Sequence, residues 1–139
     1  MIKVVKTSGK DIKDFSEKEW PAANFEHYGR REKWTTIKHT YKAVEDGKIV
    51  GILEAKYKKG ILYVEDLLVA QEKRHIGIGE LLMRKAEELA TKHKAHKIYL
   101  ETGKDWISEK FYKSLGYKEE ALLKNHWVGL DFIIFVKFL

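Results

Sequence analysis

The residues best suited to chemistry lie in one stretch, residues 67–82, where a charged turn joins an apolar strand to an amphipathic helix. The turn carries Arg74, Gly77 and Gly79, and the helix begins at once. Because glycine has no Cβ, the backbone at these positions can approach a ligand closely. The first N–H groups of a helix have no acceptor within it and lie at the positive end of its dipole. The stretch therefore predicts a site for an anionic group such as a pyrophosphate.

Two other phosphate-binding motifs are excluded by single positions. A dinucleotide-binding fingerprint requires a third glycine three residues after Gly79, and that position is Leu82. A P-loop requires lysine and then serine or threonine after its last glycine, but Glu80 follows Gly79 here. What remains is the pattern Arg-x-x-Gly-x-Gly between a strand and a helix.

Four carboxylates lie in the strands expected next to this turn. Glu65 and Asp66 interrupt the apolar strand that leads into it, and Glu54 and Glu101 lie in the two strands that should flank that one. An alkyl amine has a pKa near ~10 and arrives mostly as a cation at neutral pH. The carboxylates could bind such an amine and accept its proton. The alternative is that strand alternation directs some of them to solvent or to basic partners.

The elements that position these residues follow from hydrophobic periodicity. We expect strands over residues 2–7, 34–45, 48–57, 61–70, 97–101, 117–123 and 130–138. Helices are expected over residues 11–28, 78–93 and 106–115, with Gly116 as a C-terminal cap. The first of these helices should break near Trp20-Pro21, because proline lacks an N–H and restricts the residue before it.

The connections between these elements predict the fold class. Asp46-Gly47 and Lys59-Gly60 are typical of tight hairpins, so the three strands between residues 34 and 70 should form an antiparallel meander. The helix that follows should return the chain in a parallel strand. We therefore expect an α/β fold: a mixed, mostly antiparallel twisted sheet, with helices on both faces and a central βαβ unit, in a single domain over residues 1–139.

The turn and its surroundings resemble motif A of the GCN5-related N-acetyltransferase (GNAT) superfamily. The resemblance rests on residues 64–79 and on a second block, Phe-Tyr-Lys-Ser-Leu-Gly-Tyr at 111–117, which is similar to the Phe-Tyr-x-x-x-Gly-Phe/Tyr signature. It covers roughly residues 40–139. Two positions depart from the family pattern: His75, where the family often has glycine, and Asp105, where relatives often carry asparagine.

The resemblance implies a role for each matching residue. The turn would hold the pyrophosphate of acetyl-CoA, and Tyr112 would be the general acid for the leaving thiolate. Glu65 or Asp66 would act as base or substrate anchor, and Glu-Asp at this point is similar to the diamine acetyltransferases. The N–H groups of Leu68 and Ala70 would contact the acetyl carbonyl and the pantetheine. The expected cofactor-binding residues are Leu68, Val69, Ala70, Arg74, His75, Ile76, Gly77, Ile78, Gly79, Glu80 and Tyr112.

Composition limits the remaining classes of function. Cysteine is absent, which excludes disulfides, thiolate metal sites and an acyl-cysteine intermediate. The net charge of +6 suits an anionic ligand. No apolar run is long enough to span a bilayer and no signal peptide is present, so we expect a soluble, cytoplasmic protein. His93 and His96 are surrounded by lysines that would repel a cation, and no metal site is expected.

The leading hypothesis is direct transfer of an acetyl group from acetyl-CoA to a primary amine, and the acidic strand residues favour a small cationic amine. The alternative is a non-catalytic acyl-CoA-binding or regulatory module. A nucleic-acid-binding domain is not supported, because the sequence shows no motif that combines basic and stacking aromatic residues. His126 and Trp127 could border the acceptor site, although a loop or packing role is favoured. The acceptor, and whether the chain forms a homodimer, stay open.

Overall fold

The computed structural model describes residues 1–30 and 34–139, and the chain forms two compact units, Met1–Trp34 and Thr35–Leu139. The first unit contains one helix, α1 (Gly9–Tyr28), which Ser8 caps by accepting a hydrogen bond from the N–H of Asp11. None of the described helices combines the length and the apolar character needed to span a bilayer.

Two predictions for the first unit are wrong. Residues 2–7 form no strand, because the described part of this unit holds no second strand to accept and donate their backbone hydrogen bonds. The helix also does not break at Pro21. A proline inside a helix removes its own N–H bond, and here the helical bonds on either side of it are sufficient to continue α1 to Tyr28.

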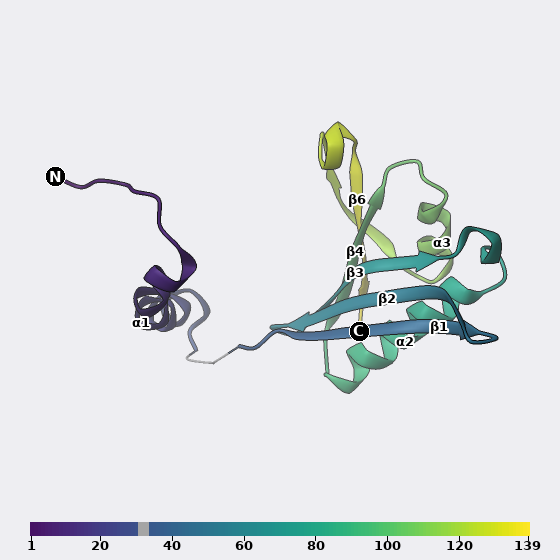
Figure 1. The fold of residues 1–139 in the computed structure, drawn as a ribbon, viewed down its shortest axis with the longest axis horizontal. Helices are drawn as coiled ribbons and strands as arrows, with labels where there is room; N and C mark the ends of the chain where they lie inside the picture. Colours follow the sequence, from purple (N-terminus) through teal and green to yellow (C-terminus); the bar gives the residue numbers. More distant parts are fainter. Residues whose placement is uncertain (31–33) are drawn as a thin grey trace. The chain divides into compact units, whose positions relative to one another are not determined.

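The second unit is a six-stranded sheet in the order β1-β2-β3-β4-β6-β5 (Figure 1). The strands are β1 (Ile37–Glu45), β2 (Lys48–Lys58), β3 (Ile61–Val69), β4 (Lys97–Gly103), β5 (Lys118–Leu123) and β6 (Phe132–Phe138). Its helices are α2 (Ile78–Lys92) and α3 (Ser108–Ser114), with short 3-10 turns η1 (Gln71–Lys73) and η2 (Trp127–Gly129). Only β3 and β4 pair in parallel, so the predicted mixed, mostly antiparallel sheet with a βαβ unit is confirmed.

The two predicted hairpins are present. Asp46 and Gly47 have φ of 48° and 75°, and Lys59 and Gly60 have φ of 52° and 84°. Positive φ at both central residues matches the right-handed twist of the flanking strands. β1, β2 and β3 therefore form the expected antiparallel meander.

α2 covers one face of the sheet. Its buried residues recur every three or four positions and are Ile78, Leu82, Met83, Ala86, Leu89 and Ala90. They join a core with alternate residues of β2 and β3, among them Leu53 and Val64, which are 0% and 4% exposed. Figure 1 shows α2 running along the strands of the meander. Burying each large side chain contributes about 1.5–3 kcal/mol, so this packing fixes where the N-terminus of α2 lies.

α3 packs on the same face of the sheet as α2. The ring of Tyr112 lies 6.0 Å from that of Phe135, which is paired with Leu100 in the buried row of β4. The opposite face carries polar residues, among them Glu54 and Tyr99. The sequence predicted helices on both faces of the sheet. Within the second unit, α2 and α3 both cover the same face.

The parallel pairing of β3 and β4 is short. It joins Ile61 to Lys97, Leu62 to Ile98 and Tyr63 to Tyr99, and no pair follows. Beyond Tyr63 the edge of β3 that faces β4 has no strand bonded to it. This open edge leads directly into the turn before α2.

A pair of imidazoles fastens the edge strand β1 to the end of α2. Nε2 of His39 lies 2.8 Å from Nε2 of His93, and the ring of Tyr57 stacks on His93 at 4.5 Å. Burial and, after it, the proximity of His93 and Lys92 lower the pKa of His39 from its ordinary value of 6.5. The folded state therefore binds a proton at this site less readily than the unfolded chain does.

This lowered pKa predicts that the protein loses stability in mild acid. As the pH falls below about 6.5, the unfolded chain takes up a proton at His39 that the folded state resists, so the free energy of unfolding should decrease. Above pH 7.5 His39 is neutral in both states and contributes no pH dependence. Urea unfolding at pH 7.5 and 5.5 should show a smaller loss for His39→Asn than for the wild type. His27→Asn, in α1, should behave as the wild type, and equal losses in all three proteins would contradict the prediction.

Candidate active site

The turn between β3 and α2 is built from two left-handed residues. His75 has φ of 64° and Gly77, the N-cap of α2, has φ of 93°. A Cβ at Gly77 would meet no heavy atom within 4 Å, so this glycine is required by its backbone conformation and leaves open space beside the helix terminus. A Cβ at Gly79 would lie 3.1 Å from Cζ of Phe111. Gly79 therefore allows α2 to pack closely on α3.

The two departures from the family pattern both occupy positive φ. His75 has φ of 64° and Asp105 has φ of 66°. Glycine adopts this region without strain, and asparagine tolerates it better than most residues do. A histidine or aspartate in this conformation costs about 1–3 kcal/mol. The strain at His75 does not prevent α2 from beginning at Ile78.

The N-terminus of α2 offers unpaired backbone donors. No side chain caps it, and the N–H groups of Ile78, Gly79 and Glu80 have no acceptor within the helix. The first N–H with a backbone acceptor is that of Leu81, which donates to the carbonyl of Gly77 at 3.1 Å. Since the helix dipole adds positive potential here, the terminus is suited to an anion.

Arg74 lies at the same turn. Its Nε donates to the carbonyl of Val69 at 3.3 Å, which fixes the side chain and leaves the two terminal nitrogens of the guanidinium available. The carboxylate of Glu80 is held 2.6 Å from the guanidinium of Arg84, so its charge is already compensated. The donors, the open space at Gly77 and the free guanidinium nitrogens together fit a diphosphate.

One predicted contact is wrong. The N–H of Ala70, expected to be free for the acetyl carbonyl, donates to the carbonyl of Val50 at 2.8 Å. Its own carbonyl accepts from the N–H of Lys73 at 2.9 Å. The reason is that β2 extends opposite the end of β3, with Gly51 paired to Val69, so Val50 reaches the next residue. Because hydrogen-bonded pairs alternate along an antiparallel ladder, the N–H of Leu68, which is paired with Ile52, is also directed to β2, and the N–H of Val69 is directed to the open edge of β3.

The structure separates the two adjacent carboxylates of β3. A register shift between Glu54 and Ala55 places Asp66 directly opposite Glu54. A hydrogen bond with Asp66, then desolvation and the charge of Asp66, raise the pKa of Glu54 above 4.5. Glu65 instead forms an ion pair with Lys56. Glu54 therefore binds a proton more readily than an isolated glutamate does, and the charge of Glu65 is compensated.

Tyr112 is almost completely buried, with 7% of its surface exposed. Desolvation raises its pKa to about 12. The Tyr112 hydroxyl has no hydrogen-bond partner among the described residues. Every fully buried side-chain oxygen of these residues does have a partner, so the Tyr112 hydroxyl is not fully buried and is accessible to solvent or a ligand. Tyr117, by contrast, donates from its hydroxyl to Glu87 at 3.2 Å.

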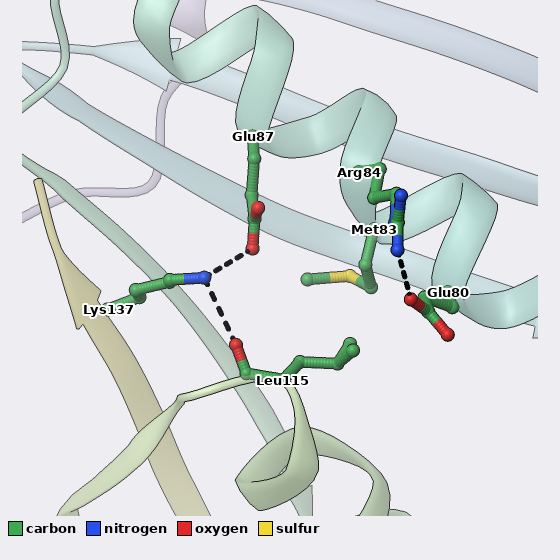
Figure 2. A pocket seen from close by; sticks show the side chains of 6 residues that line it. All are labelled: Glu80, Met83, Arg84, Glu87, Leu115 and Lys137. Carbon is green, nitrogen blue, oxygen red and sulfur yellow. Dashed lines mark hydrogen bonds and ion pairs between the residues drawn. The ribbon is translucent and has the colours of Figure 1, made fainter.

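A pocket of about 370 Å³ lies between α2, the end of α3 and β6, beside this site. Figure 2 shows that its charged groups are paired with one another: Arg84 with Glu80, and Lys137 with Glu87 and the carbonyl of Leu115. Because these charges are compensated, the pocket offers a charged ligand fewer unpaired polar groups than the turn before α2 does.

Comparisons with known proteins agree with this geometry. The sequence profile of the Acetyltransferase (GNAT) family matches residues 9–117. No curated protein sequence matches the chain. Among solved structures, an acetyltransferase from Bacillus cereus ATCC 14579 superposes with a TM-score of 0.78 at 22% identity, covering 99% of this chain and 98% of that one.

Two further structures carry more specific descriptions. A Bacillus anthracis protein assigned as a streptothricin acetyltransferase, solved with acetyl coenzyme A, has a TM-score of 0.68 at 22% identity over 73% of this chain and 62% of its own. The ribosomal-protein-alanine N-acetyltransferase of Brucella melitensis has a TM-score of 0.65 at 22% identity over 90% and 78%. At these identities the likeness shows a shared fold.

Proposed function

The chain belongs to the acetyltransferase (GNAT) family, and from that premise we propose that it transfers the acetyl group of acetyl-CoA directly to a primary amine. One observation supports the proposal: the turn between β3 and α2 combines the uncapped N-terminus of α2, behind the left-handed Gly77, with the guanidinium of Arg74, which is bonded to the carbonyl of Val69. Backbone donors, open space and a positive charge in one turn are what a diphosphate site requires.

The proposed reaction needs an acceptor for the proton of the ammonium and a donor for the leaving sulfur. Acetyl-CoA supplies the activated thioester. Asp66, together with Glu54 directly opposite it, is the proposed proton acceptor, because two neighbouring carboxylates bind one proton more readily than an isolated carboxylate does. Tyr112 is the proposed donor toward the sulfur, since its hydroxyl is unpaired within the described structure. The open edge of β3 supports contact with the pantetheine near Val69, whose N–H is directed to that edge.

Two measurements test the proposal. Isothermal titration should show acetyl-CoA binding, and thiol release should follow addition of primary amines. If acetyl-CoA does not bind, the proposed transferase activity and the proposed roles of these residues are wrong. Binding without thiol release across a broad panel of amines would instead identify a non-catalytic acyl-CoA-binding module.

Arg74→Ala should weaken acetyl-CoA binding by about 10- to 100-fold, because it removes charge-assisted hydrogen bonds worth about 1.5–3 kcal/mol. Titration calorimetry of the variant measures the change. The matched control is Arg84→Ala, in the second turn of α2, whose guanidinium is paired with Glu80. Arg84→Ala should change the Kd by less than about threefold. Equal losses in the two variants would show that net charge, rather than the turn, determines binding.

A further inference from the structure

Glu101 of β4 is held by the turn between β5 and β6. Nε1 of Trp127 donates to Oε2 of Glu101 at 3.1 Å, and Nε2 of His126 lies 3.7 Å from the same oxygen. The other carboxylate oxygen makes no hydrogen bond to any residue that the structure describes. A carboxylate fixed through one oxygen keeps the other for a ligand.

The turn that carries Trp127 is closely bonded and strained. The N–H of His126 donates to the carbonyl of Leu130 at 2.7 Å, and that of Leu130 donates to the carbonyl of Trp127 at 3.0 Å. Val128 between them has φ of 50° and ψ of 31°, a conformation that is costly for a β-branched residue. Trp127 itself is 60% exposed, so its indole gains little from packing. Strain and exposure of this kind are typical of residues retained for function.

Glu101 lies where β3 and β4 separate. The last parallel pair, Tyr63 and Tyr99, stacks its rings at 4.6 Å on the face opposite α2. Burial and, after it, the charge of Glu101 raise the pKa of both tyrosines, which shows how close this carboxylate lies to them. Since residues two apart on a strand share a face, Glu101 lies on the same face as Tyr99.

We infer that Trp127 is a positioning residue, which holds Glu101 so that its free oxygen binds a second positive charge on the acceptor. This inference rests on the proposed function. The Glu54–Asp66 pair on β2 and β3 would receive the reacting nitrogen, and Glu101 on β4 would receive the other cationic group. The indole face of Trp127 can add a cation–π contact. The acceptor class is therefore an amine that carries a second cationic group.

Indole N–H resonances report on this contact directly. In ¹H–¹⁵N spectra of the full chain saturated with CoA, Trp127→Phe identifies the Trp127 signal. Titration with 1,4-diaminobutane should move that signal to saturation, and 1-aminobutane should require a concentration at least about tenfold higher, because it lacks the second charge. Glu101→Gln should abolish the response. In turnover, Trp127→Phe should raise the KM for the diamine by about fivefold with kcat within about twofold.

Trp106→Phe is the matched control, because Trp106 is 50% exposed and packs on Phe132 beside the same turn. It should leave the Trp127 signal and the KM for the diamine unchanged. A Trp127 signal that ignores the diamine, or responds equally in Glu101→Gln, would overturn the inference. Such a result would leave the proposed function intact provided that calorimetry still shows acetyl-CoA binding, whereas loss of that binding would overturn both.

Discussion

Replacing Tyr112 by phenylalanine should lower kcat by about 10²-fold and leave the Kd for acetyl-CoA within about twofold. The hydroxyl is the only group lost, and a hydrogen bond to a charged partner is worth about 1.5–3 kcal/mol. Full proton transfer would contribute more, up to about 10⁴-fold. The pKa of Tyr112, raised to about 12 by desolvation, lies well above the ~8.5 of a thiol. Complete transfer would therefore be uphill by about 5 kcal/mol, and donation of a hydrogen bond to the developing thiolate is the stronger expectation.

The same pKa predicts the pH dependence of the reaction. Because Tyr112 keeps its proton up to about pH 12, no alkaline loss of kcat should arise from this residue below about pH 11. Quenched assays of thiol release between pH 6 and 10 measure how kcat depends on pH. Tyr112→Phe should lower the whole profile without changing its shape over this range.

Tyr117→Phe is the control for loss of a buried hydroxyl. Tyr117 is 2% exposed and its hydroxyl is bonded to Glu87 rather than left unpaired. This variant should lose about 1 kcal/mol of stability in urea unfolding and keep its kcat within about twofold. Full activity of Tyr112→Phe, or an equal loss of kcat in both variants, would remove Tyr112 from the catalytic residues.

The turn before α2 could be predicted from sequence because its signals are local. A run of apolar residues, a charged turn with glycines and a helical stripe follow one another within a few residues. The separate roles of the two glycines could not be predicted. Gly79 faces Phe111, which lies 32 positions further along the chain, and only packing of α3 on α2 brings them together. Gly77 is determined by its own φ.

The partners of the strand residues depend on register, which periodicity does not reveal. A one-residue shift between Glu54 and Ala55 decides that Asp66, rather than Glu65, faces Glu54. The extension of β2 opposite the end of β3 determines that the N–H of Ala70 donates to the carbonyl of Val50. Residues 2–7 are rich in the β-branched residues that favour a strand, but a strand forms only where a partner strand completes its hydrogen bonds. Each of these outcomes depends on contacts between segments that are distant in sequence.

That register shift gives the two adjacent carboxylates different expected roles. Asp66→Asn should lower kcat/KM for the amine by about 10²- to 10³-fold, because it removes the proposed proton acceptor and the partner of Glu54. Glu65→Gln should lower it by less than about threefold, since the charge of Glu65 is compensated by Lys56. Thiol release measured at subsaturating amine compares the two. A larger effect of Glu65→Gln would reverse the assignment.

The pH profile provides a second, independent readout of the pair. In the wild type a hydrogen bond with Asp66, then desolvation and the charge of Asp66, raise the pKa of Glu54 above 4.5, so the pair takes up its first proton at a higher pH than an isolated glutamate does. The acid loss of kcat/KM should therefore begin at a higher pH than for an isolated carboxylate. Asp66→Asn removes the like charge and should move this loss to lower pH, toward 4.5. Ionisation of the amine affects the wild type and Asp66→Asn equally, so the difference between their pH profiles reports on the Glu54–Asp66 pair alone. If kcat/KM falls at the same acidic pH in both proteins, the pair does not accept the proton.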